Sequence, residues 1–130
     1  MSRSGYSEGC DGWELICWRG AVASAIRGTR GQALLREMRD ALDAMETKEL
    51  IYGELEAEGQ HCALGVVGAK RGMDLAKIDS YDPFSVGEAF GIARALAAEI
   101  SFINDDGYGW RSTPAQRWAN VRAWVESQIR

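Results

Sequence analysis

Residues 12–26 read GWELICWRGAVASAI. Apolar side chains recur in this stretch at helical spacing, in two series on opposed faces: Leu15, Trp18, Val22 and Ala25, and Trp13, Ile16 and Gly20. A helix that is apolar on two faces is typical of the middle of a core. The stretch therefore predicts a mainly α fold organised around a buried N-terminal helix.

Further helices follow along the chain. An amphipathic stripe predicts the second helix, and its members are Leu34, Leu35, Met38, Ala41, Leu42 and Met45. Start signals at Asp82-Pro83 and Thr113-Pro114 predict a brief helix to Phe90 and a last helix whose stripe runs from Trp118 to Ile129. Between these two, an apolar face over residues 92–103 predicts another helix.

Residues 49–64 have a different pattern. Apolar and polar residues alternate here, and Glu58-Gly59 offers a turn, which together predict a short β-hairpin. A helix over residues 62–71 competes for the second half, because its alanines, leucine and valines suit a helix equally well. The predicted fold is a mainly α, single compact domain of about five helices with one short β-hairpin around residues 49–64.

Length and composition indicate one domain spanning residues 1–130. A chain of 130 residues can bury a core without disulfides or metal, and its 46% hydrophobic content argues against disorder. Residues 1–10 are polar and glycine-rich, so we expect a flexible N-terminus without a signal peptide. No apolar run is long enough to cross a bilayer. We therefore expect a cytoplasmic protein without a membrane partner.

Charge is distributed unevenly. Residues 1–36 carry a balance of +2, residues 37–60 a balance of −6 and residues 61–130 a balance of zero. The acids of the middle segment are candidate partner-binding residues: Glu37, Asp40, Asp43, Glu46, Glu49, Glu54, Glu56 and Glu58. A net charge of −4 is unfavourable for phosphate attraction, so we expect protein recognition and no direct DNA binding. The alternative interpretation is a solvated helix face and hairpin.

Cysteine usage gives a weaker candidate for catalysis. The three cysteines, Cys10, Cys17 and Cys62, form no CxxC pair and are expected to be reduced, and we expect neither a metal site nor a cofactor. Cys62 is a conceivable nucleophile at a helix start, with Asn104 and Asp105 as weak catalytic candidates beside it. His61 points away from its neighbour Cys62 in either a strand or a helix. A packed, inert cysteine is the alternative interpretation.

Several motifs together resemble a small protein family borne by bacteriophages and prophages. They are WELICWRGAVxSAIRGxRGQ over residues 13–32, Cys62-Ala-Leu-Gly65, Phe90-Gly-Ile92, Asn104-Asp105 and Thr113-Pro-x-x-Arg-Trp118. The members of this family are mostly hypothetical proteins, so the resemblance brings no catalytic residues. A phage setting implies small accessory proteins that bind and disable host complexes, anti-CRISPR proteins among them.

Three functional hypotheses follow. The first is a non-enzymatic inhibitor of a host protein or nucleoprotein complex, whose acidic segment mimics nucleic acid. The second is a cysteine-dependent enzyme that uses Cys62. The third is a regulatory homodimer, in which an arginine surface of one copy meets the acidic segment of the other; its arginines are Arg19, Arg27 and Arg30.

Overall fold

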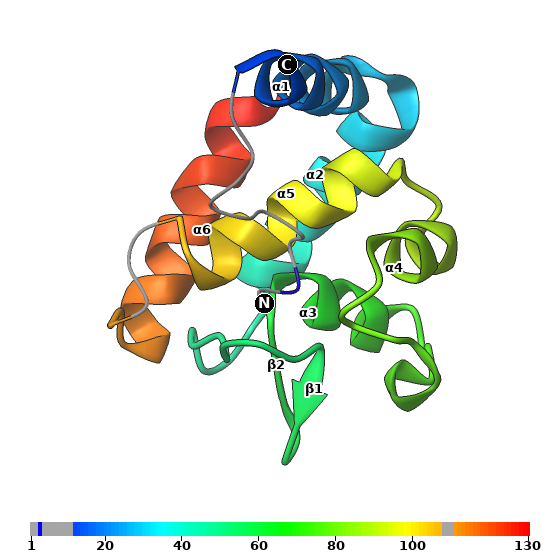
Figure 1. Cartoon of the computed structure of the whole chain (residues 1–130). Coiled ribbons are helices and arrows are strands. Elements are labelled where there is room, and N and C mark those ends of the chain that lie inside the picture. The colour runs from blue at the N-terminus through cyan, green and yellow to red at the C-terminus, as the bar shows by residue number, and fades with distance from the viewer. Residues whose placement is uncertain (1–2, 4–11, 108–110) are drawn as a thin grey trace.

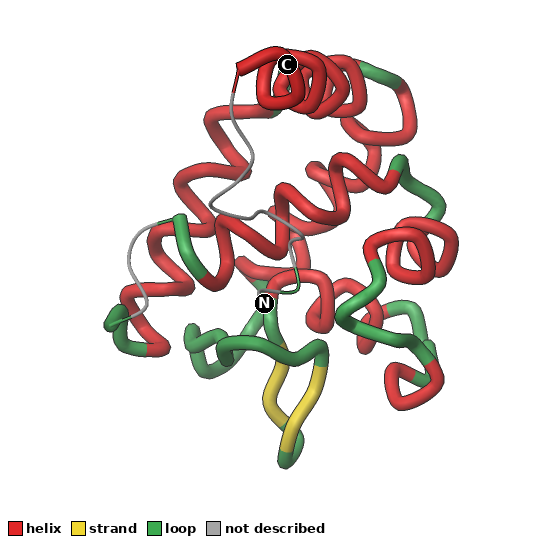
Figure 2. The backbone as a smooth tube through the Cα atoms, in the orientation of Figure 1, coloured by secondary structure: helices red, strands yellow, loops and turns green. Residues whose placement is uncertain are grey.

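The computed structural model describes residue 3 and residues 12–107 and 111–130 of the chain. Within these residues the fold is mainly helical, as predicted, with one small hairpin (Figures 1 and 2). The elements in chain order are α1 (Gly12–Arg27), α2 (Thr29–Asp43), β1 (Glu56–Ala57), β2 (Gln60–His61), α3 (Ala63–Lys70), the 3₁₀ helix η1 (Leu75–Lys77), α4 (Pro83–Phe90), α5 (Arg94–Asp105) and α6 (Pro114–Gln128).

The helix start signals read from the sequence are confirmed. The Asp82 carboxylate accepts a hydrogen bond from the Phe84 backbone N–H at 3.0 Å, with Pro83 at the first helical position. Thr113 and Gln116 form a reciprocal capping box at the start of α6. These local rules fix where two helices begin, whatever packs against them.

Hairpin and helix both form in the segment where they were expected to compete. Glu56 pairs with His61 and Ala57 with Gln60, and the turn residues Glu58 and Gly59 both have positive φ, at 53° and 78°. α3 begins directly afterwards. The hairpin projects away from the helices (Figure 2).

The prediction of a buried N-terminal helix was wrong. Leu15 is 39% exposed and Ile16 63% exposed, and among the α1 side chains that the structure describes only Val22 and Ile26 are buried. Among the described elements α1 packs mainly against α5 and α2, and Ile16 of its second apolar series faces solvent. The two-face pattern predicted the wrong position because it does not say how many neighbours the helix will have.

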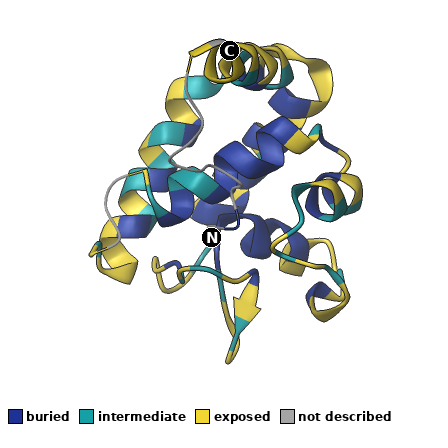
Figure 3. Cartoon of the chain, viewed as in Figure 1, coloured by how far each residue is buried: buried dark blue, intermediate teal, exposed yellow. Residues whose placement is uncertain are grey.

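The central helix is α5. It contacts α1, α3, α4 and α6, and it lies in the middle of the molecule with most of its length buried (Figure 3). Its alanines at 95, 97 and 98 keep the helix narrow, which lets several neighbours approach closely. Within the described residues, no helix combines the length and apolar character that a membrane crossing needs.

Candidate functional site

The acidic segment predicted as one contact surface divides into two parts with different environments. Glu37 accepts hydrogen bonds from Arg71 at 2.6 and 2.8 Å, and Asp43 accepts them from Arg122 at 2.7 and 3.0 Å. Asp40 pairs with its neighbour Arg39 at 3.2 Å. The two bidentate pairs fasten α2 to the end of α3 and to α6, so Glu37 and Asp43 act as structural cross-links.

These two cross-links predict a loss of stability in acid. Hydrogen bonding by Arg71 lowers the pKa of Glu37, and hydrogen bonding by Arg122 lowers the pKa of Asp43. Because these carboxyls have lower pKa values in the folded than in the unfolded state, they stabilise the fold when they are ionised. This contribution to the free energy of unfolding is complete above about pH 4.5 and is lost as pH falls below it. We expect the free energy of unfolding, measured with urea, to decrease from pH 6 to pH 3 by less in Glu37→Gln/Asp43→Asn than in the wild type. Equal decreases would contradict this role.

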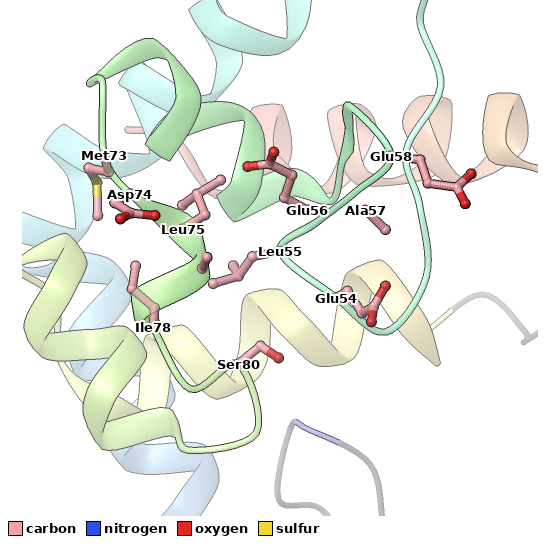
Figure 4. A pocket seen from close by; sticks show the side chains of 11 residues that line it. Glu54, Leu55, Glu56, Ala57, Glu58, Met73, Asp74, Leu75, Ile78 and Ser80 are labelled. Atoms are coloured by element: carbon pink, nitrogen blue, oxygen red, sulfur yellow. The ribbon is translucent and has the colours of Figure 1, made fainter.

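The acids of the hairpin border a groove of about 400 Å³ between the hairpin and η1. Apolar side chains of Leu55, Leu75 and Ile78 gather in it, with the carboxylates of Glu54 and Glu56 nearby (Figure 4). Further lining residues include Asp74 across the groove and Glu58 at the hairpin tip. We call this feature the acidic groove.

The charges of the acidic groove are only weakly compensated. Glu56 lies 3.7 Å from His61, and Asp74 lies 3.9 Å from Lys77, whose side chain is 83% exposed. Neither Glu54 nor Glu58 has an ion pair within the described part of the chain. The remaining predicted acids lie elsewhere: Glu46 is exposed after α2, and Glu49 lines a separate hollow on another side of the hairpin.

The three predicted arginines do not form one free surface. Arg19 binds the buried carboxylate of Glu99 at 2.8 Å, which neutralises a charge inside the central helix. Arg27 lies 3.5 Å from the Ser24 hydroxyl, and Arg30 is exposed beside the corner between α1 and α2. The homodimer hypothesis, which relied on these side chains, stays a prediction.

The weak catalytic candidates Cys62, Asn104 and Asp105 do come together, in a buried polar cluster. Asn104 accepts a hydrogen bond from Ala63 N–H at 3.1 Å and donates to the Asp105 carboxylate at 2.7 Å. Asp105 in turn binds the guanidinium of Arg3 through two hydrogen bonds of 2.6 and 2.9 Å. The bonds from Ala63 to Asn104 and from Arg3 to Asp105 join segments far apart along the chain, so local sequence patterns could not predict them.

Cys62 is packed within this cluster. Its side chain is 1% exposed, and its sulfur accepts hydrogen bonds from Gly65 N–H at 3.5 Å and Arg3 Nη1 at 3.4 Å. The residue caps α3. His61 turns to Glu56 on the hairpin. A substrate cannot reach the sulfur in this conformation, so the geometry favours the packed-cysteine interpretation.

Two arginines of this region were missed from the sequence. Arg3 falls within the segment expected to be flexible, yet it is 3% exposed; the rest of residues 1–10 lies outside the described residues. Arg117 is also buried and donates to the carbonyls of Leu50 and Ser112 at 2.9 and 3.0 Å. It lies four residues before Val121 on the buried side of α6, a spacing that would have revealed it.

The described residues contain no group of three or more His, Cys, Asp or Glu side chains arranged to hold a metal ion. In comparisons with known proteins, no family model, no curated protein and no solved structure matches this chain. The resemblance to a phage family therefore rests on the motifs quoted above, and the candidate sites rest on their own geometry.

Proposed function

We propose that this protein is a phage accessory protein that binds and inhibits a host protein or nucleoprotein complex without catalysis. Its binding surface is the acidic groove, which presents carboxylates to a basic surface in the way that nucleic acid presents phosphates. The single observation that supports this proposal is the combination of weakly compensated acids with apolar lining residues between the hairpin and η1. The host setting comes from the resemblance alone.

The groove is chemically suited to a basic partner. Carboxylates attract lysine and arginine over a distance and raise the rate of encounter, but exposed ion pairs add little affinity by themselves. Leu55 and Leu75 are almost fully buried at the base of the groove, so the half-buried side chains of Ile78 and Met73 supply the apolar surface that an aliphatic or aromatic anchor of the partner can cover. A partner segment with basic residues around an apolar one fits both features.

The geometry narrows the predicted contact set. Glu37 and Asp43 are already bound by arginines of this chain, so they have little charge to offer a partner. The hairpin projects away from the helical body (Figure 2), and its acids Glu56 and Glu58 are exposed, so a partner can approach them. We therefore assign recognition to Glu54, Glu56, Glu58 and Asp74.

Charge reversal tests this assignment. A tagged protein is used to recover partners from a host lysate at low and high salt, and binding of the recovered partner is then titrated. We expect Glu54→Lys/Glu58→Lys to weaken binding by about tenfold or more at low ionic strength and to flatten its salt dependence. A nucleic acid that the partner normally binds should compete with the wild-type protein.

The matched control is Glu46→Lys/Glu88→Lys, which changes net charge equally at two exposed acids outside the groove. We expect this variant to bind nearly as tightly as the wild type. Equal weakening by both double variants would mean that net charge alone governs binding, and would sink the groove assignment. Recovery of no partner at low salt would argue against the proposed function as a whole.

A further inference from the structure

We propose that Asp105, Asn104 and Cys62 form a preorganised guanidinium-binding site, which Arg3 occupies in the folded chain and which accepts a free guanidinium when that side chain is removed. The site is independent of the acidic groove, and its ligand class is a monosubstituted guanidinium, the group that an arginine side chain carries.

The carboxylate is held in place by groups other than Arg3. Asp105 Oδ1 accepts hydrogen bonds from the Gly53 backbone N–H at 3.1 Å and from Asn104 Nδ2 at 2.7 Å. Asn104 is itself anchored, because its Nδ2 donates to the Ile51 carbonyl at 3.0 Å and its Oδ1 accepts from Ala63 N–H. These contacts join α5, the loop before the hairpin and the start of α3, so the site keeps its scaffold without residue 3.

The shape of the site matches a guanidinium better than an ammonium. Arg3 Nε and Nη2 each bind one oxygen of Asp105, while Nη1 points to the Cys62 sulfur at 3.4 Å. Each of the three guanidinium nitrogens of Arg3 therefore has a hydrogen-bond acceptor, as the fixed, planar donor geometry of this group requires. A lysine ammonium is a point charge on a flexible stem and cannot reproduce this fork.

The surroundings also favour a bound cation. Asp105 is 4% exposed, and a buried carboxylate without a counterion is costly. Burial and the nearby charge of Asp105 raise the pKa of Asp106, whereas Arg3 lowers it. Arg117 is close enough for its charge to interact with Asp105, but its described hydrogen bonds go to backbone carbonyls, so it leaves the carboxylate oxygens to Arg3.

Chemical rescue of Arg3→Ala tests the site. We expect this full-length variant to unfold at a lower temperature than the wild type and to be restabilised by methylguanidinium, with half-saturation at about 1–30 mM. At ten times the dissociation constant the unfolding midpoint should rise by about 4 °C. The amide resonances of Gly53 and Ala63 should move during the same titration, because these N–H groups hold Asp105 and Asn104.

Four controls decide the outcome. Ethylammonium should produce no saturable rise in the unfolding temperature of Arg3→Ala. Methylguanidinium should produce none in three other proteins: the double variant Arg3→Ala/Asp105→Asn, the wild type and the exposed-arginine variant Arg30→Ala. Rescue of Arg3→Ala by ethylammonium to the same degree, or an equal response of the double variant, would overturn the proposal. So would no response of Arg3→Ala to methylguanidinium. If Arg3→Ala is unfolded in buffer, methylguanidinium should restore a dispersed amide spectrum, and failure to do so overturns the site.

Discussion

Gly65→Ala is expected to destabilise the protein by about 3 kcal/mol or more. A β-carbon on Gly65 would overlap the backbone carbonyl oxygen of Leu55, and it would also lie 3.1 Å from the β-carbon of His61. Backbone atoms cannot turn aside as the end of a side chain can. The same Leu55 oxygen accepts a hydrogen bond from Cys62 N–H at 3.2 Å, so a shift there disturbs the start of α3 as well. Urea unfolding followed by circular dichroism measures the effect.

Gly20→Ala is the matched control for this prediction. Gly20 also lies within a helix, but a β-carbon there would meet no atom within 4 Å. Alanine should stabilise α1 at this position by about 0.5–1 kcal/mol, because it restricts the unfolded backbone more than glycine does. If Gly65→Ala were as stable as Gly20→Ala, α3 would not pack against the Leu55 carbonyl as described.

Asp105→Ala is expected to cost about 3–5 kcal/mol, since it leaves the guanidinium of Arg3 buried without a counterion. The substitution also removes the acceptor for Gly53 N–H and Asn104 Nδ2. Both the lost ion pair and the orphaned donors act in the same direction. The free energy of unfolding at neutral pH is the measurement.

The adjacent acid provides the control. Burial and the charge of Asp105 raise the pKa of Asp106, which means that the folded structure disfavours the charged form of Asp106 at neutral pH. Asp106→Asn should therefore leave stability unchanged or slightly increased at pH 7. A similar loss of unfolding free energy in both variants would show that removing any acid from this turn destabilises the protein. The effect could then not be assigned to the loss of the Arg3 partner.

Local patterns predicted much of the fold. The stripe of α2 is buried as expected, with Leu34, Leu35 and Met38 nearly inaccessible. The caps at Asp82 and Thr113 form because each satisfies backbone donors within its own turn, without help from distant residues. Signals of this kind can be read from a few consecutive residues.

Other features depend on contacts between distant segments. Ile16 is exposed because none of the described elements covers its face of α1, and the number of neighbours that a helix has is a property of the whole fold. Arg3 and Asp105 are separated by 102 positions, and no periodicity links them. The acidic segment is continuous in sequence, but Glu37 pairs with Arg71, whereas Glu54 has no ion pair among the residues that the structure describes. Sequence proximity therefore predicted a single surface where the fold makes two environments.

The turn at the tip of the hairpin contains a residue that its backbone conformation disfavours. A two-residue turn with positive φ at both positions is normally made by Asn-Gly or Asp-Gly, since a longer side chain is strained there. This chain has Glu58 at φ 53°, a conformation that costs a residue other than glycine about 1–2 kcal/mol. The turn thus accepts a less stable residue than the backbone prefers. The tip of the hairpin therefore holds a carboxylate at the expense of turn stability.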